Sequence, residues 1–150
     1  MMRRTSASDV LVPFVAVAAV VYVLLKLSYN SLPPFQWFAA VPIGALAVAE
    51  FVMARRVRLA VRHEPGAKVM TALSIARSVA LGKASSLVGA GVSGAALALV
   101  VTVLPDSSRT SAAGHDLWVG LVLLVVSAAV TAAGLVLERA GIDPNRDRRD

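Results

Sequence analysis

Four long apolar stretches constrain the fold of this chain more than any other feature. They cover residues 10–29, 35–53, 84–104 and 117–137, and only Lys26 and Glu50 interrupt them with a charge. Each stretch has about 20 residues, which is the length that an α-helix needs to cross the hydrocarbon core of a bilayer. The alternation of period two that a membrane-spanning strand requires is missing. The sequence therefore predicts an all-α integral membrane bundle of four transmembrane helices.

The composition agrees with this class. Hydrophobic residues make up 57% of the 150 residues, and the mean hydropathy is +0.74. A chain this apolar cannot cover a water-soluble globule with polar groups. Cysteine is absent, which excludes disulfides, thiolate metal sites and a cysteine nucleophile.

The predicted organisation is one membrane domain between two short ends. Residues 1–9 form an N-terminal segment, residues 10–138 the four-helix domain, and residues 139–150 a flexible tail. Within the domain, helices are expected at about 10–29, 35–53, 73–104 and 117–137, with a basic loop over 54–72. The short proline-containing turn at 30–34 predicts that the first two helices pack side by side as an antiparallel hairpin. Pro42 predicts a kink inside the second helix.

Positive charge indicates the topology. Thirteen of the 15 Lys and Arg residues lie before the first helix, between the second and third, or after the fourth. By the positive-inside rule, both termini and the middle loop are expected in the cytoplasm of a multi-pass plasma-membrane protein. Tyr29, Trp37 and Trp118 fall at the opposite interface, where amphipathic rings are favoured. Both signals predict the same orientation.

Small residues recur along the third predicted helix. At helical spacing they form a ridge that lets another helix approach closely, which in lipid depends on van der Waals contact. The ridge consists of Gly82, Ser86, Gly89, Ala90, Gly94 and Ala98. The closest contact is expected at Ser86, Ala90, Gly94 and Ala98, which lie well inside the bilayer.

A few charged side chains near membrane depth are the candidates for a polar site. Glu50 and Lys83 lie near the same end of their helices and either form an ion pair or extend separately into the headgroups. Glu138 and Arg139 reach the same layer, so the four residues together define a candidate polar vestibule. Their spacing indicates no metal site and no catalytic pair. No cofactor is predicted.

The middle loop carries a basic patch made of Arg55, Arg56, Arg58, Arg62, Lys68 and Arg77. Residues 54–62 are expected to extend the second helix until the sequence 63–66 breaks it. Val69, Leu73, Ala76 and Ala80 form one apolar face at the entry to the third helix. The patch either recognises anionic lipid or an anionic partner, or it only sets the topology.

Two motifs resemble functional ones by chance. Residues 89–94 match G-x-G-x-x-G, but a dinucleotide site requires a preceding strand, and this match lies inside a membrane helix. His115 and Asp116 are adjacent and do not face one site on a helix. Asp116 is instead expected to cap the fourth helix.

The residues 76–94, Asp116, and Leu137-Glu138-Arg139 resemble an uncharacterised actinobacterial family of small integral membrane proteins. The resemblance covers nearly the whole chain and implies a four-helix protein of unknown function, often encoded near folate-biosynthesis genes. Members of the family often have a cysteine after the Glu-Arg pair, where this chain has Ala140 and Gly141. This departure argues against a role for a thiol there.

Three classes of function remain open from the sequence. The first is a non-enzymatic accessory or scaffold protein that uses its small-residue ridge to pack against itself or another membrane protein. The second is a small-molecule transporter that works as an oligomer, and the third is an enzyme acting on lipid at the interface. The expected partners are the bilayer, anionic lipid, a second copy or another membrane protein, and not nucleic acid.

Overall fold

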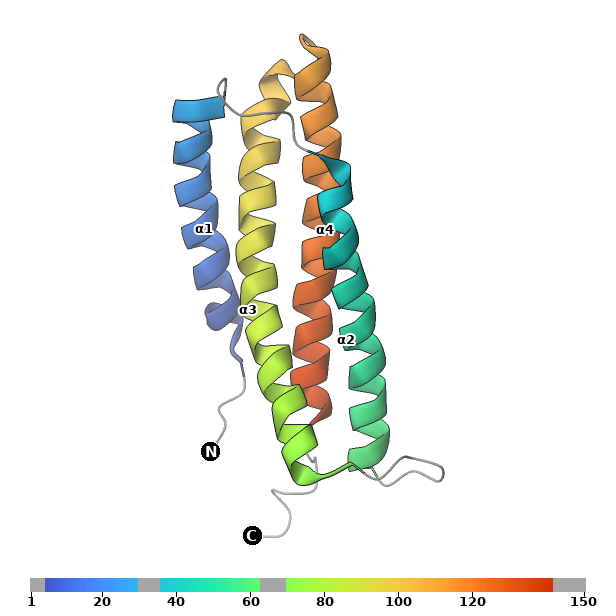
Figure 1. Ribbon diagram of the computed structural model, residues 1–150. Coiled ribbons are helices and arrows are strands. Elements are labelled where there is room, and N and C mark those ends of the chain that lie inside the picture. The colour runs from blue at the N-terminus through green and yellow to red at the C-terminus, as the bar shows by residue number, and fades with distance from the viewer. Residues whose placement is uncertain (1–4, 30–35, 63–69, 142–150) are drawn as a thin grey trace.

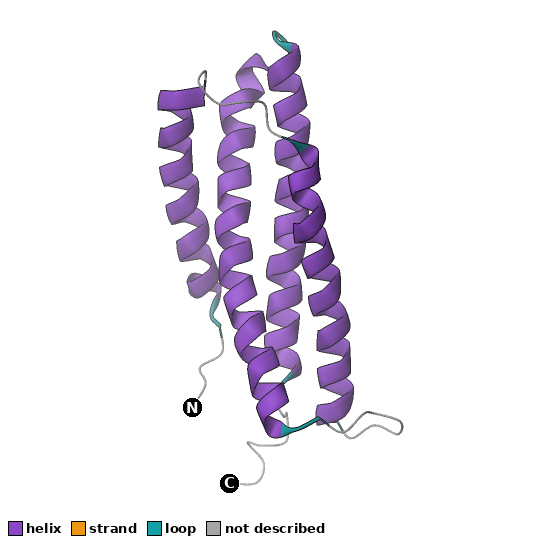
Figure 2. Cartoon of the chain, viewed as in Figure 1, coloured by secondary structure: helices purple, strands orange, loops and turns teal. Residues whose placement is uncertain are grey.

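The computed structural model describes residues 5–29, 36–62 and 70–141, and these residues are almost entirely helical (Figures 1 and 2). The helices are α1 (Ala7–Ser28), α2 (Ala40–Val61), α3 (Ala72–Val103) and α4 (Ser111–Ala140). Each is long and apolar enough to cross a membrane, and the described residues contain no strand. The prediction of an all-α protein with four membrane-spanning helices is confirmed.

Local capping sets the start of α4 earlier than the apolar pattern predicts. The Thr110 side chain accepts a hydrogen bond from the Ala113 N–H (3.3 Å), so the helix begins at Ser111. Such a cap satisfies one of the four N–H groups that every helix leaves unpaired at its start. Asp116 lies in the second turn, and the prediction that it caps the helix is wrong.

Helix α2 is shifted toward the C-terminus relative to the prediction. A turn of 3₁₀ helix at Trp37–Ala39 precedes it, and Pro42 falls in its first turn. Pro42 thus lies inside α2 as predicted, but a proline in the first turn removes an N–H that has no partner within the helix, so no kink is required there. At its other end α2 continues to Val61, through the first part of the predicted basic loop. The predicted break at 63–66 lies outside the described residues.

The four helices stand in the spatial order α1, α3, α4, α2 (Figure 1). The α3–α4 interface is the most extensive, α1 packs on α3, and α2 packs on α4. Helices α1 and α2 make no contact with each other, so the prediction of a neighbouring hairpin is wrong. The physical reason is that α3 and α4 present small residues that allow close approach, and they take the centre. In the described part of the chain, α1 and α2 are therefore left on opposite flanks.

Two glycines bring the backbones of α3 and α4 into contact. A β-carbon on Gly82 would lie 2.7 Å from the Gly134 carbonyl oxygen, and one on Gly134 would lie 2.6 Å from the Gly82 carbonyl oxygen. Further along the same interface, the Ser93 hydroxyl lies 2.9 Å from the Ser127 hydroxyl. Close backbone approach and polar contacts between helices are the usual means of packing in lipid.

The small-residue ridge of α3 faces two different neighbours. Gly82 and Gly89 contact α4, whereas Gly94 contacts the backbone of α1 at Phe14 and Ala18. A helix advances about 100° per residue, so a series with a spacing of four drifts by about 40° at each step. Between Gly82 and Gly94 the ridge turns by about 120°. The ridge residues Ser86, Ala90 and Ala98 are also buried.

The contact between Gly94 and α1 generates a testable prediction. A β-carbon at Gly94 would overlap the Phe14 carbonyl oxygen, which the rigid backbone cannot move aside. We expect Gly94→Ala to lower the free energy of unfolding in detergent by about 1–3 kcal/mol, the range for overpacked cores. Gly44→Ala is the matched control, because its nearest neighbour would be a Val126 methyl at 3.6 Å. Equal thermal midpoints for the two variants would contradict this packing.

Candidate functional site

Glu50 is a carboxyl group buried in the membrane-spanning part of α2. It is 2% exposed, and neither carboxyl oxygen has a hydrogen-bond partner among the described residues. The Ser85 hydroxyl of α3 faces the group without meeting hydrogen-bond geometry. Glu50 is buried because it shares a stripe with Ala47, Ala54 and Val57, the buried side of α2. Such a group in a membrane helix is costly and is a candidate functional residue.

Glu138 is another buried carboxyl group, and it has a partner. It is 4% exposed, and its Oε1 accepts a hydrogen bond from the Thr5 N–H at 2.7 Å. Its Oε2 has no partner in the described part of the chain. Glu138 therefore ties the segment that leads into α1 to the end of α4.

The two carboxyl groups of the predicted vestibule lie on different flanks of the bundle. Glu50 faces α3 from the α2 flank, whereas Glu138 binds Thr5 on the α1 flank. Because both Glu50 oxygens lack a partner among the described residues, Glu50 and Lys83 form no hydrogen-bonded ion pair. Lys83 is half-buried on α3. Arg139 is exposed and lines a different feature, a groove.

The groove lies between α1 and α4 and has a volume of about 570 Å³. The backbone of α1 lies close to α3 but not to α4, so α1 and α4 form walls with α3 as the floor. Ala90 and Ser93 form the floor. The walls are Thr5, Ser6, Ala7, Val10, Leu11 and Phe14 on the α1 side, and Leu124, Ala128, Thr131, Ala132, Leu135 and Arg139 on α4. It is an apolar groove with a polar end.

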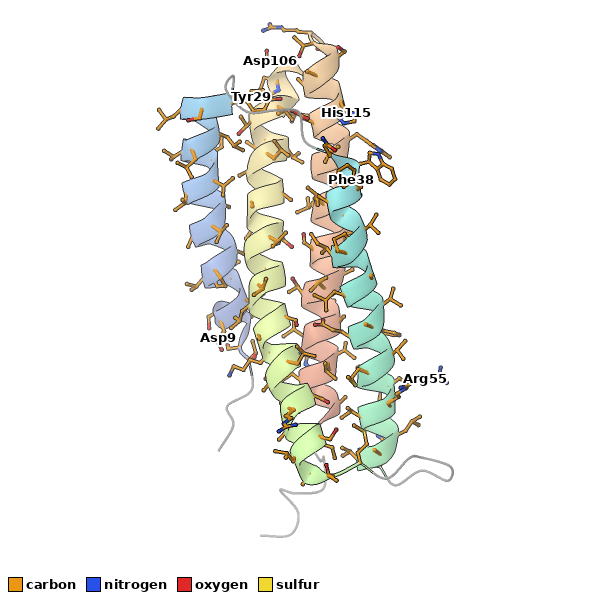
Figure 3. The ribbon with its side chains drawn as sticks, in the orientation of Figure 1. Asp9, Tyr29, Phe38, Arg55, Asp106 and His115 are labelled. Atoms are coloured by element: carbon orange, nitrogen blue, oxygen red, sulfur yellow. The ribbon has the colours of Figure 1, made fainter. Side chains whose placement is uncertain are left out.

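The opposite end of α1 is held against the bundle by a second hydrogen bond. The Tyr29 hydroxyl donates to Asp116 Oδ2 at 2.8 Å, and Tyr29 lies at the end away from Asp9 (Figure 3). Burial, and after it the hydrogen bond to Asp116, raises the pKa of Tyr29 to about 12. The phenol therefore stays protonated and remains a donor at physiological pH. Beside it, Leu25 packs with Leu99 and Ala113, where α1 meets the start of α4.

The described members of the basic patch lie near one end of the bundle and are exposed. This end, where α1 and α3 begin and α2 and α4 finish, is called the basic end below. Arg55 points away from the bundle on α2 (Figure 3). Arg56 and Arg58 follow on the same helix, Arg62 comes directly after its end, and Arg77 lies on α3. Lys68 lies outside the described residues. Of the predicted apolar face, Leu73, Ala76 and Ala80 are exposed on α3, and Val69 is not described.

Sequence reasoning missed the groove and the bond between Tyr29 and Asp116. These two residues are 87 positions apart, and no local pattern connects them. The buried stripe of α2 could have been found, because Ala40, Ala47 and Ala54 repeat every seven residues as in a left-handed helix crossing. The groove depends on how far α1 stands from α4, which no single helix encodes.

The fold defines a class, a four-helix membrane protein with buried carboxyl groups and a groove between α1 and α4. The described residues hold no group of three or more His, Asp or Glu side chains that could bind a metal. Residues 10–144 match the model of a family described as "Protein of unknown function (DUF3180)", and the chain belongs to this family. The comparisons with curated proteins and with solved structures gave no match. The resemblance to a family of unknown function is confirmed, while actinobacterial origin and gene neighbourhood stay predictions.

The buried carboxyl groups of Glu50 and Glu138 should respond oppositely to replacement. We expect Glu50→Leu to raise the free energy of unfolding by about 1–3 kcal/mol, because it removes buried acceptors that have no partner. Glu138→Leu should lower it by a similar amount, because the Thr5 N–H loses its acceptor. Thermal unfolding in mild detergent measures both. If both variants were destabilised alike, Glu50 would have a stabilising partner and this account of its environment would be wrong.

Proposed function

We propose that the protein is a non-catalytic accessory protein that binds another component of the membrane, with the groove between α1 and α4 as its binding surface. The observation that carries this proposal is the separation of α1 from α4. Helix α1 is attached at its two ends, through Thr5 to Glu138 and through Tyr29 to Asp116, and it packs only on α3 between them. The attachments support a groove that persists when it is empty.

The size and lining of the groove suit a binding site. Its volume of about 570 Å³ lies within the range of ligand pockets, about 300–1,000 Å³. Leu11, Phe14 and Leu135 make its walls apolar, so its occupant should also be largely apolar. Since membrane-spanning helices form both walls, the occupant would enter from the bilayer.

The small-residue ridge of α3 does not offer a second surface of this kind. Its residues are buried in contacts with α4 and α1, so self-association through the ridge would require the bundle to open. The distribution of Lys and Arg supports a cytoplasmic position for the basic end in a plasma membrane. On that orientation the polar end of the groove faces the cytoplasm.

Site-specific photocrosslinking tests the proposal. A photoreactive amino acid at Ala128 lines the groove, whereas one at Val125, 69% exposed on the same helix, lies outside its lining. In native membranes we expect Ala128 to give a defined adduct, identified by mass spectrometry as one lipid or one membrane protein. Val125 should give only a mixture of bulk lipids. Identical adduct patterns at both positions would contradict a binding role for the groove.

A transporter is the second candidate, and the burial of Glu50 favours it. A carboxyl group without a partner in a membrane helix can exchange a proton during transport. If this function holds, proteoliposomes should take up protons under an applied membrane potential, and Glu50→Gln should abolish the uptake. A pH-sensitive dye inside the vesicles measures it. No uptake by the unmodified protein, or equal uptake by the variant, would contradict the transporter.

A further inference from the structure

The length of the groove matches one leaflet of a bilayer. Its lining on α4 runs from Leu124 to Arg139, which is about 22 Å at the helical rise of 1.5 Å per residue. One leaflet contributes half of a hydrocarbon core of about 30 Å, and its headgroup layer adds several ångströms. The groove thus runs from the headgroups at the basic end into the hydrocarbon. This is the path of a lipid chain lying parallel to the helices.

The polar end of the groove suits an anionic headgroup. Arg139 lines it, and Thr5 contributes a buried hydroxyl, Oγ1, that has no hydrogen-bond partner in the described part of the chain. The two nearby acidic groups are already engaged with backbone N–H donors. Asp9 accepts from Ser6 at 2.8 Å, and Glu138 accepts from Thr5 at 2.7 Å. A guanidinium and a hydroxyl donor together recognise a phosphate oxygen well.

We propose that the groove binds one anionic phospholipid from the leaflet at the basic end. One acyl chain lies between α1 and α4 over Ala90 and Ser93, and the headgroup phosphate contacts Arg139 and Thr5. This inference rests on the proposed function, since it names the occupant of that binding surface. It differs from general attraction to the basic patch, because Arg55, Arg56 and Arg58 lie on α2, on the opposite flank.

Fluorescence quenching by brominated lipid tests the occupant in the intact chain. Trp37 and Trp118 are first changed to Phe, and a single tryptophan is placed at Leu11 or Val12. Both positions are exposed on α1, 60% and 66%, but only Leu11 lines the groove. The protein is reconstituted in phosphatidylcholine containing a small fraction of phosphatidylglycerol with brominated chains. Quenching at each position reports the local fraction of the brominated lipid.

We expect Leu11→Trp to report an enrichment of phosphatidylglycerol about fivefold above that at Val12→Trp, the factor that one cation contributes near a membrane surface. Adding Arg139→Gln should remove the excess, whereas Arg139→Lys should keep most of it. Arg55→Gln, on the other flank, should leave it unchanged. Filling the groove with Ala132→Phe should remove the excess without changing any charge. Circular dichroism confirms that each variant is folded.

Three results would overturn the inference. The first is equal quenching at Leu11→Trp and Val12→Trp. The second is an excess of phosphatidylglycerol at Leu11→Trp that survives Arg139→Gln in a folded protein. The third is an excess that Arg55→Gln reduces as much as Arg139→Gln does. Photocrosslinking from Ala128 separates these failures from failure of the proposed function. A defined protein adduct with no enrichment of phosphatidylglycerol would retain the groove as a binding surface and reject the lipid. Bulk lipid adducts at Ala128 would reject both.

Discussion

The contact between the backbones of α3 and α4 at Gly82 and Gly134 is the constraint on which the rest of the arrangement depends. Inside a bilayer, burying apolar surface between helices gains little, because lipid chains are equally apolar. Close contact and polar bonds between helices must hold the bundle instead. The two glycines remove the side chains that would separate these helices, and Ser93 with Ser127 adds a hydrogen bond at the same interface. The central pair thereby leaves the other two helices only its flanks.

The number of buried residues on α1 and α2 follows from this order of packing. Helix α2 lies along α4 with a stripe of small residues, and that stripe places Glu50 in the interior although its neighbours offer the carboxyl group no partner. Helix α1 has a single fully buried residue, Leu25, because α3 covers only one of its sides. The unequal burial of the flanking helices explains why one flank holds an unpaired carboxyl group and the other holds a groove.

Hydropathy predicts the number and class of the helices because a membrane span is a local property of about 20 residues. It misplaces the start of α4, where capping by Thr110 decides the boundary, whereas the basic extension of α2 to Val61 was predicted from residues 54–62. The order of the helices could not be predicted, since adjacency in sequence says nothing about which faces approach most closely. The ridge was found, but a spacing of four conceals a turn of about 40° per step. The one row of small residues on α3 therefore contacts two helices, α4 and α1. Among the site residues, the burial of Glu50 follows from its place on the buried stripe of α2, whereas the hydrogen bond between Thr5 and Glu138 required the fold.

The attachments of α1 explain why a groove forms on this flank. Near the middle, Gly94 draws α1 onto α3, and at the end opposite the basic end Leu25 and Tyr29 close it against α3 and α4. At the basic end the Thr5 N–H donates a hydrogen bond to Glu138. The chain therefore contacts α4 there through the residue that precedes α1. Between these points the small side chains Ala128 and Ala132 of α4 do not extend far enough to meet α1, which leaves the groove. A bilayer cannot leave such a space empty. Among the described residues of its lining, Arg139 is the one cationic side chain, and the proposed preference for an anionic lipid depends on it.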